Sequence, residues 1–132
     1  MPPAGDRPRP PVDRRRLDLG AQGEDLAAAW YTSRGYTVLG RNWRCRDGEL
    51  DLVVARGRCV VFCEVKTRTG TGFGIPAEAV TGEKQRRLRR LAARWLAEQP
   101  PSGGFSDLRF DVACVTLRGG AAPELEVIEA AF

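Results

Sequence analysis

The sequence predicts an α/β domain in which two helices cover the two faces of a mixed β-sheet. Residues 18–34 and 81–98 place apolar side chains at the spacing of an amphipathic helix, and five shorter stretches are rich in β-branched and aromatic residues. The resulting order is helix, strand, strand, strand, helix, strand, strand. Crossovers between parallel strands are right-handed. The second helix is therefore expected on one sheet face and the first helix on the other.

The first helix is predicted over residues 18–34. Asp18 can cap its N-terminus, and Gly35 stands where a left-handed C-terminal residue belongs. The apolar face consists of Leu19, Gly23, Leu26, Ala27 and Trp30. Glu24 lies beside this face, where it either points into a neighbouring cleft or is an ordinary solvent-facing glutamate.

The segment before this helix, residues 1–16, is predicted to be a disordered basic tail, so one folded domain is expected over residues 17–132. The segment is rich in proline and carries five arginines against two aspartates. Its few large apolar side chains cannot offset the entropy of ordering. It is either an extension without a role or a segment that attracts nucleic acid non-specifically.

After a strand over residues 36–44, residues 47–68 are predicted to form two strands joined by a tight turn at Arg56 and Gly57. Four ionisable residues interrupt these otherwise apolar strands: Glu49, Asp51, Glu64 and Lys66. Since side chains alternate along a strand, Glu49 and Asp51 point the same way, and so do Glu64 and Lys66. Ionised groups on a half-buried strand are costly unless they are paired or bind a metal.

The second half of the chain continues with a glycine-rich stretch, residues 69–80, which is either a mobile flap or a plain connection. Thr81 caps the second helix, which ends at about Glu98 before two prolines. Strands over residues 108–117 and 125–128, separated by a glycine turn, complete the domain.

Composition narrows the chemistry. The chain has no histidine, so mechanisms that need an imidazole are excluded, and its four cysteines form no C-x-x-C pair that would indicate a zinc site. It also has no long apolar run and no signal peptide, so a cytosolic protein without a membrane partner is expected. Residues 83–98 carry six basic residues against two acidic ones. This basic helix is either a solvated face or a surface for a polyanion.

Asp51 and Glu64, on neighbouring strands, make an oxygen-rich site of the type that Mg²⁺ prefers, with Mn²⁺ as the alternative. The backbone carbonyl of Val65 can add a ligand, and Lys66 can orient or deprotonate a water or neutralise a phosphate. The alternative is a salt bridge of Lys66 with Glu64 or Asp51 inside the sheet. Glu49 is either a third ligand or lies at the exposed end of the sheet.

Asp51, Glu64-Val65-Lys66 and the preceding Glu24 resemble the motif of the PD-(D/E)xK nuclease superfamily, which includes restriction endonucleases and archaeal Holliday-junction resolvases. From about Gly20 to the C-terminus, the chain is similar to the uncharacterised bacterial YraN-like family. The stretches that carry this second resemblance are GEDLAAAWYTSRGYTVLGRNWR, GELDLV, FCEVKTR and FGIPAEAVTGEKQRRL.

The resemblance implies a restriction-endonuclease-like, three-layer α/β/α fold. It implies that Asp51 and Glu64 are metal ligands, with Lys66 as the catalytic lysine. Glu24 would be an outer or second metal-site acid, and Gln85 would lie beside the site. Leu50 departs from the superfamily pattern, which has proline before the first aspartate.

The function expected from this resemblance is a metal-dependent endonuclease that acts on DNA rather than RNA, including branched or repair structures. The residues expected to contact nucleic acid are Lys84, Arg86, Arg87, Arg90 and Arg68. A two-fold symmetric substrate would call for a homodimer. The alternatives are a nucleic-acid-binding module that keeps the fold without turnover, and a small protein-interaction domain whose basic helix is only a soluble face.

Overall fold

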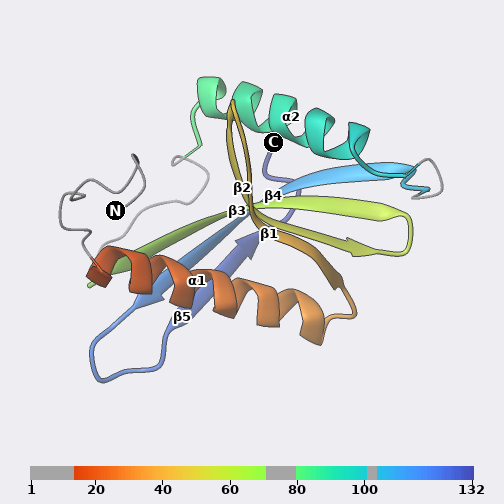
Figure 1. The fold of residues 1–132 in the computed structure, drawn as a ribbon. Coiled ribbons are helices and arrows are strands. Elements are labelled where there is room, and N and C mark those ends of the chain that lie inside the picture. The colour runs from red at the N-terminus through yellow and green to blue at the C-terminus, as the bar shows by residue number, and fades with distance from the viewer. Residues whose placement is uncertain (1–13, 71–79, 101–103) are drawn as a thin grey trace, which may run out of the picture.

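The computed structural model describes residues 14–70, 80–100 and 104–132, with no side chains described before Asp18. Two helices and five strands follow one another in the predicted order (Figure 1). They are α1 (Arg14–Ser33), β1 (Thr37–Cys45), β2 (Gly48–Arg56), β3 (Cys59–Thr69), α2 (Gly82–Ala97), β4 (Asp107–Leu117) and β5 (Glu124–Ile128). Neither helix in this described part of the chain is long and apolar enough to span a membrane.

The sheet has the order β1-β2-β3-β4-β5 and is mixed, as predicted. Strand β3 pairs with β4 in parallel, and the other neighbours are antiparallel. The parallel pair is the one joined through α2, because only a crossover connection can return the chain to the same edge in the same direction.

Each helix covers one face of the sheet, which confirms the three-layer prediction. The α2-side core consists of Leu50, Val53, Val60, Phe62, Val80, Leu88, Leu91, Ala92, Trp95, Phe110 and Val112. The α1-side core consists of Ala27, Ala28, Tyr31, Tyr36, Leu52, Val54, Val61, Cys63 and Ala113. The hydroxyl of Thr81 accepts a hydrogen bond from the backbone N–H of Lys84 at 3.2 Å, so Thr81 caps α2 as expected.

Two local predictions were wrong. Helix α1 begins at Arg14, so Asp18 lies inside the helix and does not cap it. Arginine and leucine are good helix formers, and nothing in residues 14–17 stops the helix from extending toward the N-terminus. The turn between β2 and β3 is formed by Gly57 and Arg58, since Arg56 already pairs with Cys59. The predictions for residues 1–13 and 71–79 lie outside the described residues.

A buried polar network joins α1 to β4. The Asp111 side chain is fully buried, and it accepts a hydrogen bond from the Tyr31 hydroxyl at 2.6 Å and two from the Arg109 guanidinium at 2.8 Å. The backbone N–H of Ala130 donates a further bond at 3.0 Å. Since every oxygen of this carboxylate has a partner, its burial is compensated, and the network fixes how α1 sits on the sheet.

The sheet opens at one place, between β2 and β3. Their ladder runs from Arg56 and Cys59 to Leu52 and Cys63, where it ends, while β1 and β2 stay paired to the tip of their hairpin. That hairpin tip leaves the sheet plane and curves toward α2 (Figure 1), where Cys45 packs against the α2-side core. The sequence-predicted acids of β2 and β3 lie at this opening.

Candidate metal centre

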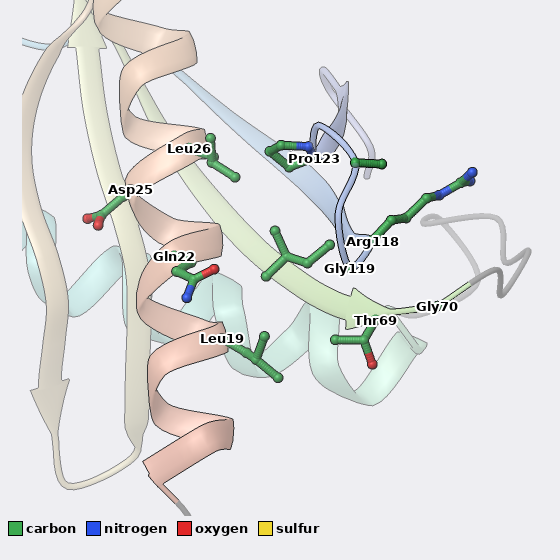
Figure 2. Close-up of a pocket in the computed structure, with 11 residues that line it drawn as sticks. Leu19, Gln22, Asp25, Leu26, Thr69, Gly70, Arg118, Gly119 and Pro123 are labelled. Carbon is green, nitrogen blue, oxygen red and sulfur yellow. The ribbon is translucent and has the colours of Figure 1, made fainter.

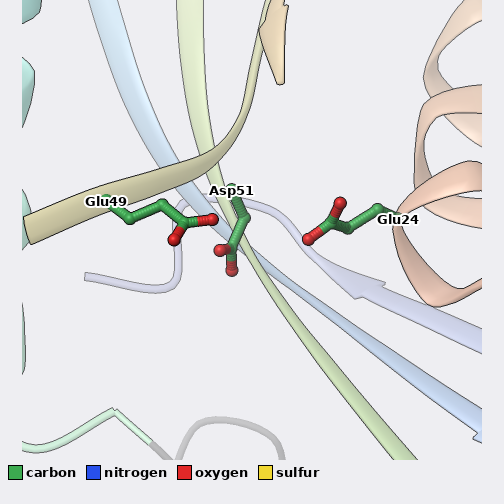
Figure 3. A group of neighbouring side chains, drawn as sticks. All are labelled: Glu24, Glu49 and Asp51. Atoms are coloured by element: carbon green, nitrogen blue, oxygen red, sulfur yellow. The ribbon is translucent and has the colours of Figure 1, made fainter. Parts of the chain in front are cut away.

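Three carboxylates converge at the opening between β2 and β3. Glu24 comes from α1, and Glu49 and Asp51 come from β2, with one oxygen of each carboxylate within 4.8 Å of the others. Figure 3 shows Glu24 and Glu49 reaching toward Asp51 from opposite sides. All three residues are half-buried. Glu24, expected to be either a site acid or a surface glutamate, therefore points into the site, and Glu49 joins it.

Asp51 is at the centre of this group, and its pKa is raised from 3.8 to about 7. Burial is the largest cause, followed by the negative charge of Glu64 and then of Glu24 and Glu49. The backbone N–H of Val65 donates to Asp51 at 2.9 Å and acts in the opposite direction. The net rise shows that negative charge at this point is under-compensated.

The chemistry of this donor set fits a divalent cation. Carboxylate oxygens are the hard ligands that Mg²⁺ and Mn²⁺ take, and a cation among them would relieve the repulsion that raises the pKa of Asp51. Among the ion pairs formed by the described residues, none involves Asp51. Arg41 lies 3.8 Å from Glu24, and the exposed Arg44 lies 3.2 Å from Glu49.

Glu64, predicted either as a metal ligand or as a salt-bridge partner of Lys66, pairs with two lysines. It is buried, and its Oε1 lies 2.7 Å from the Lys84 ammonium and 3.4 Å from the Lys66 ammonium. It is not one of the three converging carboxylates, although its charge still raises the pKa of Asp51. The salt-bridge alternative therefore describes the Glu64–Lys66 pair, whereas Asp51 has no such partner among the described residues.

Lys66 lies beside Glu64, as strand alternation predicts. Burial, followed by the hydrogen bond with Lys84, lowers the pKa of Lys66, while Glu64 acts in the opposite direction. A lysine with a lowered pKa is more easily found as the free amine, which is the form that accepts a proton.

Two other predicted site residues make backbone contacts. Val65 reaches Asp51 through its N–H group, a contact that the sequence did not indicate. Gln85, on the first turn of α2, donates from its side-chain amide to the carbonyl of Val80 at 3.2 Å. The Gln85 amide therefore bonds to the backbone just before α2 and does not donate to a carboxylate of the cluster.

Comparison with known proteins identifies the family. The model of the uncharacterised protein family UPF0102 matches residues 23–115, which include α1 from Gly23 onward, the opening of the sheet and most of β4. The chain belongs to the UPF0102 family. This confirms the predicted relationship with the YraN-like proteins.

Curated relatives named as UPF0102 proteins cover nearly the whole chain. One from Rhodococcus opacus is 52% identical over 88% of this chain and 97% of its own length. One from Frankia casuarinae is 54% identical over 90% of this chain and 99% of its own length, and one from Nocardia farcinica is 50% identical over 86% and 88%. Their names state the family and no activity.

The basic residues of α2 in this UPF0102 chain divide into two groups. Arg89 lies over the Phe110 ring at 5.0 Å, and Arg94 pairs with Asp47 at 3.3 Å. Arg86, Arg87 and Arg90 are exposed and make no ion pair or ring contact with the described residues. This second group is available for a polyanion.

The other predicted contact residues on the basic side are already engaged. Lys84 holds Glu64, and it lines a 280 Å³ hollow together with Arg87 and Arg90. Arg68 extends from β3 and donates to the Cys114 thiol at 3.4 Å. The two thus differ from the exposed arginines of α2.

Three hollows lie near the carboxylates, and one of about 520 Å³ is lined by Glu49 and the tip of the β1–β2 hairpin. A second one of about 360 Å³ is lined by Glu24, Val65 and Lys66 together with neighbouring residues of α1 and β3. A larger apolar one of about 640 Å³ lies between α1 and the β4–β5 connection and shares Leu19 and Thr69 with the second (Figure 2). The apolar hollow contains none of the predicted site residues, whereas the 360 Å³ hollow contains both a carboxylate of the cluster and Lys66.

Sequence reasoning missed Asn42. Its side-chain amide donates to Glu24 Oε2 at 2.8 Å, so it holds one of the three carboxylates. The available signal was an asparagine inside the strand predicted over residues 36–44, where this residue type is disfavoured. That signal alone did not indicate what the side chain contacts.

Proposed function

We propose that this protein is a metal-dependent phosphodiesterase that cleaves nucleic acid, with DNA as the substrate. One observation carries the proposal: the carboxylates of Glu24, Glu49 and Asp51 converge where the sheet opens, around an aspartate whose pKa is about 7. Groups with strongly shifted pKa values in a cleft are typical of functional sites. The resemblance to the PD-(D/E)xK nucleases supports the same conclusion.

The residues of the cluster would hold the metal. Glu24, Glu49 and Asp51 offer oxygen ligands, and the Val65 N–H fixes the orientation of Asp51. A bound Mg²⁺ or Mn²⁺ supplies Lewis-acid stabilisation of the negative charge that develops on a phosphate during hydrolysis. The site needs no histidine for this chemistry.

Lys66 supplies the proton chemistry. It lines the same 360 Å³ hollow as Glu24, so a phosphate in this hollow would lie between the cluster and the lysine. In hydrolysis, a water oxygen bonds to phosphorus, the P–O ester bond breaks, and the free amine of Lys66 accepts the proton from the water. The leaving oxygen takes a proton from solvent. Glu64 keeps Lys66 in place for this role.

The exposed arginines of α2 support nucleic acid as the substrate. Arg86, Arg87 and Arg90 carry charges that no described residue neutralises, and the same helix brings Lys84 to Glu64. Phosphate contacts of this kind supply sequence-independent affinity that weakens as salt rises. The α2 surface would therefore hold the backbone while the cluster acts on one phosphodiester.

The test is cleavage by the purified protein of branched, flapped and duplex DNA, and of RNA, with Mg²⁺ or Mn²⁺ and with a chelator. We expect metal-dependent cleavage that is lost in Asp51→Ala and in Lys66→Ala. Asp107→Ala is the control, because Asp107 is exposed, lies outside the cluster and forms no ion pair with the described residues. Absence of cleavage with every substrate, or full activity in Lys66→Ala, contradicts the proposal.

A second candidate is a nucleic-acid-binding module without turnover. It is favoured by the pairing of Glu64 with two lysines, at 2.7 Å and 3.4 Å, which is also what a purely structural ion-pair network would show. This function predicts DNA binding that survives Asp51→Ala and is unaffected by a chelator. The cleavage and binding measurements together decide between the two.

A further inference from the structure

Asn42 of β1 combines an unusual backbone with a contact to the carboxylate cluster. Its φ is 52°, and it is one of two residues other than glycine with positive φ in the described part of the chain. Its amide donates to Glu24 Oε2 at 2.8 Å. A non-glycine residue in this region of backbone space is uncommon, and such residues concentrate at functional sites.

The backbone at Asn42 turns the strand over. In a regular strand, residues on either side of a given position share a face. Here Arg41 bonds to Asp25 of α1 at 2.7 Å, whereas Trp43 packs against the α2-side core. The two neighbours of Asn42 therefore lie against opposite helices.

Strand β2 changes face at the same level. Leu50 belongs to the α2-side core and Leu52 to the α1-side core, although both flank Asp51. The ladder pairs Trp43 with Leu50 and continues past Asn42, so the two strands turn over together. This concerted turn takes the hairpin tip out of the sheet, and it brings Glu49 and Asp51 to the side where α1 presents Glu24.

Asparagine meets both requirements of this position. Asparagine and glycine adopt the left-handed backbone more readily than other residues, but glycine has no side chain to donate a hydrogen bond. Aspartate also tolerates this backbone, but its carboxylate would repel Glu24. Of these three residue types, only asparagine both adopts this backbone and donates a hydrogen bond to Glu24.

We propose that Asn42 is a positioning residue of the metal centre: its backbone aims Glu49 and Asp51 at Glu24, and its amide fixes Glu24 as a ligand. This inference rests on the proposed function, because it assigns Asn42 a role toward the metal that the cluster would hold. Groups that orient metal ligands typically change metal affinity by 10–100-fold when they are removed.

The experiment measures Mn²⁺ binding by calorimetry and the melting temperature without metal, for the full chain and for three variants. Asn42→Gly keeps the backbone turn and removes the amide, so it is expected to melt at or above the parent temperature but to bind Mn²⁺ at least tenfold more weakly. Asn42→Ala removes the amide and strains the backbone, so it is expected to lose both affinity and stability. Asp107→Asn, at an exposed position outside the cluster, is the control, with unchanged affinity.

A second measurement tests whether Asn42 acts through Glu24. In a Glu24→Ala background, Asn42→Gly is expected to have no further effect on Mn²⁺ affinity, because the bond it removes is already lost. An undiminished effect in that background overturns the inference. Unchanged affinity in Asn42→Gly, or a failure of that variant to fold, overturns it as well. If the parent protein does not bind Mn²⁺ at all, the proposed function fails, and the role of Asn42 fails with it.

Discussion

Replacing Asp51 with asparagine should make the protein more stable at pH 8 while it destroys the metal site. The pKa of Asp51 rises from 3.8 to about 7 on folding, mainly through burial and the charge of Glu64. Asparagine has the same shape, carries no charge and can still accept the Val65 N–H that Asp51 accepts at 2.9 Å. The substitution therefore removes the cost of ionisation and keeps the hydrogen bond.

The magnitude follows from the pKa. Each pKa unit corresponds to about 1.4 kcal/mol, so the rise to about 7 places the cost of an ionised Asp51 on the order of 2–4 kcal/mol. The upper figure is the full conversion, and the lower allows for residual contact with water. For a chain of this length, the gain in Asp51→Asn corresponds to roughly 10 °C in melting temperature.

The stability gained by Asp51→Asn should increase with pH, because only the ionised form of Asp51 is costly in the folded state. Well below pH 3.8, Asp51 is protonated in both the folded and the unfolded chain, so its ionisation costs nothing. As pH rises from about 4 to about 7, the unfolded chain releases the proton first, and the folded state loses stability until the folded pKa is passed. The advantage of Asp51→Asn should therefore be full at pH 8 and fall to about 1 kcal/mol at pH 4.5.

The assay is denaturant unfolding of the parent protein and of Asp51→Asn. Both proteins are measured without metal at pH 4.5 and pH 8, and again with Mn²⁺ at pH 8. Mn²⁺ should stabilise the parent and leave Asp51→Asn unchanged, since a ligand stabilises only the state that binds it. Asp107→Asn, at an exposed position outside the cluster, controls for the loss of one negative charge. The reasoning is refuted if Asp51→Asn is less stable than the parent at pH 8, or if its advantage is the same at both pH values.

Two further predictions concern the helices. Gly23→Ala should destabilise the fold by about 1–3 kcal/mol in denaturant unfolding, because an added Cβ would overlap a side chain of β3. Gly20→Ala in the same helix meets open space and should stabilise the fold by about 0.5–1 kcal/mol. Equal effects of the two would contradict this close approach. Combined replacement of Arg87 and Arg90 by alanine should weaken DNA binding and reduce the salt slope by about 2, whereas Arg94→Ala, already paired, should change little. A salt slope that stays unchanged would remove α2 from the DNA interface.

Most of the fold could be predicted because it follows from local patterns. The spacing of Leu88, Leu91 and Trp95 defines α2, and Thr81 caps it as the sequence indicates. The parallel pairing of β3 and β4 follows from the crossover alone. The start of α1 was missed because Asp18 was taken as the cap, whereas the helix begins at Arg14.

The site was predicted less completely, because its geometry depends on contacts between distant parts of the chain. Strand alternation placed Glu49 on the same side as Asp51 but left the role of Glu49 open. Glu49 reaches the cluster because both strands turn over at the level of Asn42. Likewise, Glu64 was predicted as a metal ligand or as a partner of Lys66, but its ion pair with Lys84 of α2 was not predicted. Neither the left-handed backbone nor the approach of a side chain from a helix leaves a periodic signal in sequence.

The end of the β2–β3 ladder accounts both for the opening in the sheet and for the position of the Asp51 carboxylate. The β2–β3 ladder ends at Leu52 and Cys63, so the Val65 N–H needs an acceptor other than the opposite strand, and Asp51 provides one. An uncharged acceptor would serve the fold better, because the aspartate must lose part of its hydration there. An ionised carboxylate at this position is an advantage only if its negative charge binds a positively charged partner. With Glu24 and Glu49 turned toward the same point, that charge favours a bound cation.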